Sequence, residues 1–313
     1  MYNYNAIRIK ECVMTYGVID VGSNTVRLCI YDVEGEKITS LFNNKTTAGL
    51  IGYVHDGELS KVGIKKACNV LSTYKEMAAR AQMEALYVFA TASLRNISNT
   101  EEAVKEIKET TGLDVDILSG YEEAVLDFEG AASSMKLDDG VMVDIGGGST
   151  EILVFKNGKI KDAESLDFGS LSMYKTYVSK LFPKGSEKKA IRKRVEAELK
   201  EVRFLHKGEH KKMIGIGGTI RAVKKFNNER FDMGRENDRI PVGNMQLLLE
   251  EFKDEEKQIL NKILRVAPDR VHTLIPGMII LDTVCRYCGC DEIVMSSFGV
   301  REGYLYKKVV GKK

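Results

Sequence analysis

The chain has 313 residues, of which 43% are hydrophobic and 29% are charged. This composition is typical of globular proteins and excludes a disordered, collagen-like or coiled-coil chain, and the length predicts about two domains. The formal net charge of +2 gives no general argument for binding to nucleic acid or to an anionic membrane. Glycine is enriched, with 28 residues, and proline is scarce, with 4, which indicates tight turns between regular elements rather than a flexible linker.

The N-terminal end differs from the rest of the chain. Regular structure is expected to begin at Met14, and residues 1–13 are interpreted as a frayed tail or a misassigned translation start in a bacterial gene. They lack the apolar core of a secretory signal, and the longest apolar stretch, near 274–284, is too short and too polar to span a bilayer. We therefore expect a cytoplasmic protein without membrane contact.

Six cysteines in a chain of this length do not form a disulfide scaffold, which agrees with a reducing compartment. Three of them, at 285, 288 and 290, have spacing that resembles a metal site. A metal site would need a fourth ligand, and the sequence has no second Cys-x-x-Cys pair to supply it. We therefore expect these thiols to be buried core residues.

An internal repeat is the most informative feature of the sequence. Residues 18–31 and 142–155 follow the same order at a constant offset of 124 residues. Each has an apolar strand ending in Asp-x-Gly, a turn of small residues, and a second apolar strand; Asp20 corresponds to Asp144. Two such hairpins in register predict two similar domains that face each other.

Helices and strands alternate between and after these hairpins, which predicts an α/β protein. In chain order, the patterns predict a helix at 64–82, a strand at 86–90, a helix ending near Gly112 with a capping box of Ser98 and Glu101, a strand at 115–118, helices at 122–132 and 186–207, and a strand at 213–216 followed by a glycine turn and a helix from Ile220.

The second hairpin turn, residues 144–151, combines carboxylates with four small residues. Glycine lets a backbone approach a phosphate closely, and a carboxylate at the end of a strand can hold Mg²⁺ directly or through water. The alternative is an ordinary hairpin turn, but so many small residues would weaken a simple strand junction. The pattern favours a phosphate-binding site with a divalent cation.

The two hairpins and the segment 215–219 resemble the phosphate-binding motifs of the actin, sugar-kinase and Hsp70 superfamily. The residue sequences of the motifs resemble those of the exopolyphosphatase/guanosine pentaphosphate phosphohydrolase family over about Met14 to Lys308. Five segments carry this resemblance in order: DVGSNT at 20–25, ATASLR at 90–95, SGYEEA at 119–124, DIGGGSTE at 144–151 and SFGVREG at 297–303. Val300 stands where leucine is usual in the family.

The resemblance implies two ribonuclease-H-like domains of the actin-like ATPase fold, with a cleft between them. Residues 14–122 and 300–313 would form the N-terminal domain, and residues 123–299 the C-terminal domain. Long family members continue into an HD-type helical domain that extends the substrate channel. This sequence shows no such domain, so shorter polyphosphate chains are expected to be favoured.

Carried over by position, the resemblance implies that Glu123 is the general base, and that Asp20, Asp144 and Glu151 bind Mg²⁺ or its water shell. Only one of Glu122 and Glu123 can point into the cleft, since they are adjacent on a helix. The residues implied to bind phosphate are Gly22, Ser23, Asn24, Thr25, Arg95, Gly146, Gly147, Gly148, Ser149, Gly217, Gly218 and Thr219. From the residues alone, Glu123 can also be a solvent-facing acid at a helix start, and Arg95 a structural loop residue. Arg301 and Glu302 are expected to support the cleft and begin the last helix.

The implied function is Mg²⁺-dependent hydrolysis of the terminal phosphoanhydride bond of inorganic polyphosphate. Hydrolysis of guanosine pentaphosphate by the same site is the close alternative. A small-molecule kinase or a regulatory nucleotide-binding protein of the same superfamily is the alternative of another class. The expected partners are a polyphosphate or guanosine polyphosphate and a second copy of the chain, with no nucleic acid.

Overall fold

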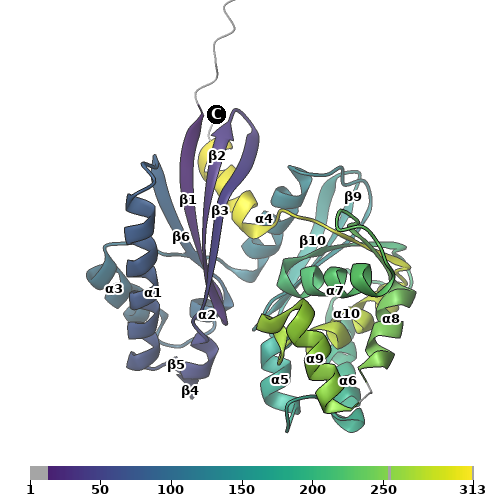
Figure 1. Ribbon diagram of the computed structural model, residues 1–313. Helices are drawn as coiled ribbons and strands as arrows, with labels where there is room; N and C mark the ends of the chain where they lie inside the picture. Colours follow the sequence, from purple (N-terminus) through teal and green to yellow (C-terminus); the bar gives the residue numbers. More distant parts are fainter. Residues whose placement is uncertain (1–12, 253–254, 312–313) are drawn as a thin grey trace, which may run out of the picture.

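The computed structural model describes residues 13–252 and 255–311. The first strand begins at Met14, as expected, while the prediction for the segment before it falls almost wholly outside the described residues. Two α/β lobes lie side by side, and each is built on one mixed β-sheet (Figure 1). The α/β class and the two-lobe arrangement follow the prediction from the repeat.

The first lobe has a five-stranded sheet in the order β3-β2-β1-β6-β7. Its strands are β1 (Met14–Val21), β2 (Thr25–Glu34), β3 (Lys37–Thr47), β6 (Ala85–Ala90) and β7 (Asp116–Ile117), and a small ribbon pairs β4 (Val54–His55) with β5 (Glu58–Leu59). Helices α1 (Lys61–Ala79) and α3 (Thr100–Thr111) cover one face of the sheet, where their apolar residues join one buried core. The short α2 (Ala92–Arg95) follows β6.

The second lobe has a six-stranded sheet in the order β10-β9-β8-β11-β13-β12. Its strands are β8 (Gly140–Ile145), β9 (Thr150–Lys156), β10 (Lys159–Leu166), β11 (Lys212–Ile216), β12 (Arg239–Pro241) and β13 (Glu292–Met295). Its helices are α5 (Ser170–Tyr177), α6 (Gly185–Glu201), α7 (Gly217–Arg230), α8 (Val242–Glu251), α9 (Glu256–Val266) and the buried α10 (Leu274–Cys288). The three clustered cysteines lie in this core, as predicted.

The repeat seen in the sequence extends to strand order, direction and individual hydrogen bonds. In both lobes an antiparallel three-stranded meander joins a parallel strand on its far side. Asp20 pairs in register with Arg27, and 124 residues later Asp144 pairs with Glu151. The N–H of Gly22 donates to the Thr25 carbonyl at 3.0 Å, and the N–H of Gly146 donates to the Ser149 carbonyl at the same distance.

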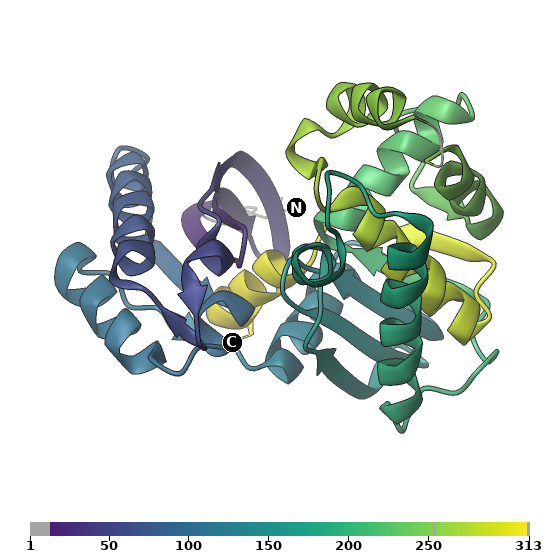
Figure 2. The same cartoon turned by 90° about the horizontal axis from the view of Figure 1, so that it is seen from below.

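Two helices cross between the lobes: α4 (Gly120–Ala132) and α11 (Val300–Leu305), the latter continued by a π-helical turn to Val310. Leu126 of α4 belongs to the first lobe's core together with Leu305, whereas Phe128 packs on the second sheet. Figures 1 and 2 show the yellow C-terminal helix reaching from the second lobe into the first. The domain boundaries predicted at 122/123 and 299/300 therefore fall inside α4 and at the first residue of α11.

The capping box predicted at Ser98 and Glu101 is wrong. The Ser98 hydroxyl instead donates to the carbonyl of Gly57, and α3 begins two residues later at Thr100. A capping box forms on α4, where the Ser119 hydroxyl accepts from the Glu122 N–H at 3.1 Å and the Glu122 carboxylate accepts from the Ser119 N–H at 3.0 Å. The predicted end of α3 at Gly112 is confirmed, since this glycine adopts the left-handed conformation.

Glycine permits the close crossing of α4 and α11. A Cβ atom at Gly303 would collide with the backbone carbonyl of Leu126, and one at Gly130 would collide with that of Gly299. We expect Gly303→Ala to lower the free energy of unfolding by about 1–3 kcal/mol, because the two helix backbones must move apart. Urea unfolding followed by circular dichroism measures this difference.

Gly243→Ala on α8 is the matched control, since a Cβ atom there meets nothing within 4 Å. This exposed helical position should be neutral or slightly stabilised by alanine. Equal unfolding midpoints for Gly303→Ala and the wild type would show that the helices do not depend on this close approach.

Candidate active site

A cavity of about 130 Å³ lies between the lobes where the two repeated turns meet. The lobes are also bridged around it, by Asn96 Nδ2 donating to Asp167 Oδ1 at 3.2 Å and by Lys175 Nζ donating to the Ile51 carbonyl at 2.9 Å. The sequence-predicted residues that line the cavity are Asp20, Gly22, Ser23, Asn24, Thr25, Glu123, Asp144, Gly146, Gly147, Gly148, Ser149, Gly217 and Gly218. Arg95, Glu151 and Thr219 are not among the lining residues.

Both turns have their carbonyl groups tied back to neighbouring segments. The Ser23 carbonyl accepts from the Ile51 N–H at 3.0 Å, and the Gly147 carbonyl accepts from the N–H groups of Leu171 and Ser172 at the start of α5. In a trans peptide the next N–H points opposite to the carbonyl, so the N–H groups of Asn24 and Gly148 face away from these partners. Each turn thereby offers backbone donors, rather than acceptors, to an anion in the cavity.

The turns approach each other closely because glycine occupies the second one. A Cβ atom at Gly148 would lie 2.8 Å from Ser23 Oγ in the opposite lobe. Gly217 has φ of +86°, and a Cβ atom there would collide with the Asp144 carboxylate. The hydroxyl of the nearby Thr219 donates to the Ile145 carbonyl at 3.0 Å, so this residue ties α7 to β8 instead of reaching the cavity.

The capping box of α4 decides which of two adjacent glutamates faces the cavity. Glu122 folds back onto its own helix start, where Ser119 binds its carboxylate. Glu123 points the other way, is 9% exposed and lines the cavity. The prediction that only one of the two can point inward agrees with this geometry.

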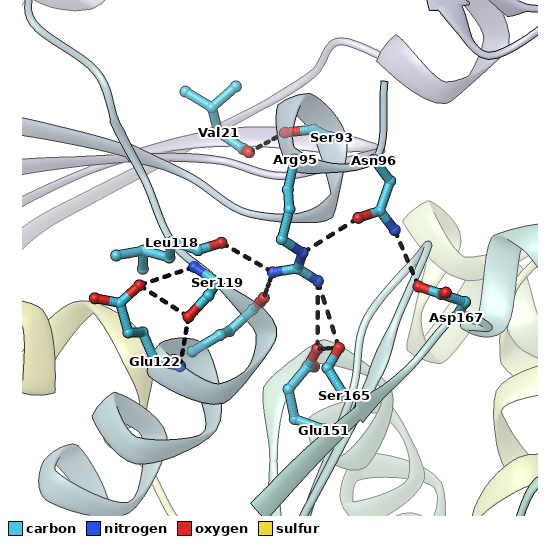
Figure 3. A network of polar contacts seen from close by, with 11 residues as sticks. Val21, Ser93, Arg95, Asn96, Leu118, Ser119, Glu122, Glu151, Ser165 and Asp167 are labelled. Carbon is cyan, nitrogen blue, oxygen red and sulfur yellow. Dashed lines mark hydrogen bonds and ion pairs between the residues drawn. The ribbon is translucent and has the colours of Figure 1, made fainter. Parts of the chain in front are cut away.

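Arg95 binds Glu123 and does not line the cavity. Figure 3 shows the Arg95 guanidinium between Leu118 of the first lobe and Glu151 and Ser165 of the second. Its Nη1 donates to Glu123 Oε2 at 2.8 Å and to the Leu118 carbonyl at 3.1 Å. Its Nη2 lies 3.9 Å from Glu151 Oε1, and Ser165 Oγ donates to that same oxygen at 2.7 Å. The guanidinium thus links α2 of the first lobe to α4 and β9, and it fixes the direction of Glu123. Binding of phosphate by Arg95, which the resemblance implies, stays a prediction.

The carboxylates around the cavity hold their protons more tightly than usual. Burial raises the pKa of Glu123 well above its ordinary value; Glu151 adds to this and Arg95 opposes it. Burial also raises the pKa of Asp144 to about 6, against the opposing charge of Arg221. Burial, together with Asp144, raises the pKa of Glu151 to about 7. A cation placed among these groups would relieve their mutual repulsion.

Four arginines line the cavity that were not predicted to bind there: Arg27, Arg221, Arg270 and Arg301. Arg27 could have been found from the repeat, since it is the register equivalent of Glu151. Arg221 follows Gly217 by one helical turn, whereas Arg270 lies in a 3₁₀ turn (Pro268–Arg270) with no motif of its own. These side chains give the near-neutral chain a local concentration of positive charge.

Arg301 and Glu302 support the cleft and begin the last helix, as expected. Arg301 Nη1 lies 3.6 Å from Asp20 Oδ2. Glu302 accepts from the Gly299 N–H at 2.9 Å and from the Tyr31 hydroxyl at 2.5 Å, so it caps α11 and ties it to β2.

Asp127 is a further cavity residue that sequence reasoning missed. It follows Glu123 by one helical turn, is 1% exposed, and its Oδ1 accepts from the Val300 N–H at 2.7 Å. Its Oδ2 has no hydrogen-bond partner among the described residues. Its spacing of four from Glu123 on a predicted helix was the available signal.

The three carboxylates predicted to bind metal are not brought together as one set. Asp20 lies next to Arg301, and Glu151 is not among the residues that line the cavity. Within the described ranges, no three side chains of His, Cys, Asp or Glu are placed to hold a metal ion together. Mg²⁺ usually keeps several waters and uses one or two carboxylates with substrate phosphates, so Asp144 and the unpartnered Asp127 oxygen fit a hydrated ion.

The model of the Ppx/GppA phosphatase family matches residues 29–311. This chain belongs to that family. A Ppx/GppA protein of Aquifex aeolicus superimposes with a TM-score of 0.80 and 24% identity, covering 96% of this chain and 99% of that one. An exopolyphosphatase of Cytophaga hutchinsonii gives a TM-score of 0.80 at 20% identity, over 95% and 98% of the two chains.

Curated relatives of this Ppx/GppA protein are distant. Exopolyphosphatase 1 of Mycobacterium tuberculosis is 23% identical over 95% of this chain and 88% of the relative. The bifunctional 3-dehydroquinate synthase/phosphatase of Fusobacterium nucleatum is 27% identical, and the guanosine-5'-triphosphate,3'-diphosphate pyrophosphatase of Aeromonas hydrophila is 24% identical. These two matches include 89% and 93% of this chain. They include only 44% and 58% of the two relatives, which are longer.

No helix in the described part of this family member is long and apolar enough to cross a membrane. The expected cytoplasmic location and homodimer stay predictions.

The buried carboxylates should make stability depend on pH in a defined direction. Because Glu151 has a higher pKa in the folded than in the unfolded protein, the folded state keeps a proton that the unfolded state has lost, and stability falls as the pH rises from about 4.5 to 7. The Glu151→Gln variant lacks this titrating group, so it lacks this contribution to the pH dependence of stability. Its stability relative to the wild type should therefore increase between pH 4.5 and pH 8, by up to about 3 kcal/mol, in urea unfolding without divalent cations.

Glu122→Gln is the control, and its stability relative to the wild type should change with pH in the opposite direction. Hydrogen bonds from Ser119 lower the pKa of Glu122, so this variant should lose stability relative to the wild type as the pH rises through the acidic range. The effect should be smaller, because the Glu122 side chain is 46% exposed. A constant difference between Glu151→Gln and the wild type at all pH values would contradict a raised pKa at Glu151.

Proposed function

We propose that this protein is a Mg²⁺-dependent exopolyphosphatase, which hydrolyses the terminal phosphoanhydride bond of inorganic polyphosphate and releases phosphate. The observation that carries the proposal is the buried Glu123 at a cavity bounded by two phosphate-type turns and four arginines. A regulatory module that hydrolyses little does not need a buried carboxylate held by an arginine at this position. Family membership agrees with this activity.

Glu123 is suited to activate a water molecule. Its Oε2 is occupied by Arg95 Nη1, which leaves Oε1 to accept the proton of a water that attacks the terminal phosphorus in line. The anhydride bond then breaks, and its oxygen leaves as the end of the shorter chain. Because little covalent chemistry is needed, positioning and charge neutralisation supply most of the rate enhancement.

The cavity supplies charge neutralisation from two sources. The backbone donors of the two turns and the four arginines would bind the non-bridging oxygens of the reacting phosphates. When bound, Mg²⁺ would neutralise charge on the phosphates, and Asp144 with Asp127 would hold its water shell, while Asp20 lines the same cavity and Glu151 does not. Burial of these carboxylates without a nearby cation raises their pKa values, which is the state that such an ion relieves.

Guanosine pentaphosphate is the second candidate substrate, because the Aeromonas hydrophila relative carries a guanosine-polyphosphate activity in its name. One assay separates the candidates. The protein is incubated with Mg²⁺ and, in turn, tripolyphosphate, long-chain polyphosphate, guanosine pentaphosphate, and ATP with a panel of sugars, and released phosphate is measured. Release from polyphosphate at higher kcat/KM than from the guanosine compound supports the proposal; no release from either contradicts it. The same series tests the expected preference for short chains.

Glu123→Gln should lower kcat by about 10²- to 10⁴-fold, because the amide cannot accept the proton of the attacking water. Circular dichroism and the unfolding midpoint should stay close to those of the wild type. Glu122→Gln, one residue away on the same helix, is the control and should keep kcat within about twofold, since Glu122 faces its own helix start. Comparable loss in both variants would argue against a base at Glu123.

Arg95→Gln should shift the pH dependence of kcat/KM. Arg95 lowers the pKa of Glu123, so removing the guanidinium raises that pKa further. Glu123 acts in its deprotonated form, and therefore the acidic limb of the profile should move to higher pH. Arg95→Lys should shift the limb less, because lysine keeps the charge but loses the planar fork. An unmoved limb in Arg95→Gln would mean that Glu123 does not control it.

A further inference from the structure

A second cavity, of about 690 Å³, lies beside the catalytic one. It is formed by α7, the loop that follows it, the end of α9 and the end of β13. Its lining includes Arg221, which also lines the catalytic cavity, so one side chain belongs to both. We call this second cavity the α7 groove.

Cations outnumber anions in the α7 groove. Its lining has five basic side chains and two acidic ones: Arg221, Lys224, Lys225, Arg235 and Arg265 against Glu229 and Asp232. Arg265 forms an ion pair with Glu229. Among the residues that the structure describes, the other four basic side chains have no carboxylate within ion-pair distance. Mutually close cations without internal partners attract an anionic ligand.

The groove follows α7 away from the catalytic cavity. Gly217 and Gly218, at the first turn of α7, line the catalytic cavity. Arg221, Lys224, Lys225 and Asn228 follow at spacings of three or four residues, which places them on one face of the helix. From Arg221 to Asn228 this face extends about 10 Å along the helix axis. Figure 1 shows α7 and α9 side by side on the second lobe.

We propose that the α7 groove binds the distal phosphates of a polyphosphate chain whose terminal phosphate is hydrolysed at Glu123, with Arg221 at the junction of the two cavities. The proposal rests on the exopolyphosphatase function proposed above. It makes the groove a subsite for chain length: a short substrate fits within the catalytic cavity alone, whereas a long chain also contacts the lysines of α7.

The lining favours a flexible polyanion over a nucleoside. The described lining residues include no aromatic side chain on which a base could stack, and their apolar members are Met233, Val266 and Met295. Burial lowers the pKa of Arg221 to about 10, with the neighbouring Arg301 and Arg27 adding to this. A phosphate between the two cavities would relieve this repulsion, and a neutral sugar or base would not.

The test is the triple variant Lys224→Gln, Lys225→Gln, Arg235→Gln, none of which lines the catalytic cavity. For long-chain polyphosphate, KM should rise about tenfold, with kcat unchanged and a weaker dependence of KM on salt. For tripolyphosphate, both KM and kcat should stay within about twofold of the wild type. This split between substrates is the result that a structural role of the three residues would not produce.

The matched control removes the same charge elsewhere: Lys189→Gln, Lys193→Gln, Lys200→Gln on α6, where the three side chains are exposed and line neither cavity. It should behave as the wild type on both substrates. Equal increases of KM in the two triple variants would reduce the effect to net charge and overturn the proposal. The proposal would also be overturned if the α7 triple variant raised KM only for guanosine pentaphosphate, because the groove would then bind a nucleoside.

Binding without turnover separates the groove from the proposed reaction. In a Glu123→Gln background, titration with long-chain polyphosphate should give a Kd about tenfold higher with the α7 triple substitution than without it. If the wild type releases no phosphate but this difference holds, the proposed function fails and the groove stands. If phosphate is released and the Kd does not change, the groove fails and the function stands.

Discussion

The crossing of α4 and α11 is the contact on which the rest of this structure depends. Gly130 and Gly303 allow the two backbones to touch, and Asp127 of α4 accepts the first N–H of α11 at 2.7 Å. Because α4 contributes to the cores of both lobes, its direction fixes the distance between the two sheets. The phosphate turns then meet across a gap that only a glycine at 148 allows. A contact at the wall of the cavity therefore sets its width.

The same crossing forces carboxylates into a low-dielectric space. Glu123 and Asp127 enter from α4, and Asp144 enters from the end of β8, so burial and mutual repulsion raise their pKa values. Such clustering costs stability, and it persists where surrounding groups or ligands compensate for it. The positive charge of Arg95 offsets this cost at Glu123. Neighbouring arginines offset it at Asp20 and Asp144. The unsatisfied Asp127 oxygen has no such compensation in the described chain.

The repeat made the fold predictable, because strand order and turn chemistry are encoded locally in each copy. Glu123 was implied by the family resemblance, and the structure shows why it faces the cavity in place of Glu122: Ser119 and Glu122 bind each other at the helix start. The contact of Arg95 with Glu123 could not be predicted, since it depends on how the two lobes close. Arg270 could not be predicted, because its 3₁₀ turn reaches the cavity only through the packing of α9 and α10 around it. The prediction of a capping box on α3 was wrong for a similar reason, because the Ser98 hydroxyl binds the distant carbonyl of Gly57 instead of the helix start.

Divergence between the two copies of the hairpin explains how one cavity can serve a cation and an anion together. Opposite Asp20 the first copy has Arg27, and opposite Asp144 the second copy has Glu151, in the same register. The first hairpin is thereby nearly neutral, with an arginine that lines the cavity, whereas the second carries two carboxylates whose mutual repulsion a divalent ion would relieve. The turns themselves remain alike, down to the Gly22 and Gly146 hydrogen bonds, so both present backbone donors to the cavity. One difference at equivalent positions of the two strands, Arg27 in the first and Glu151 in the second, is enough to give a repeated pair of turns unlike charge.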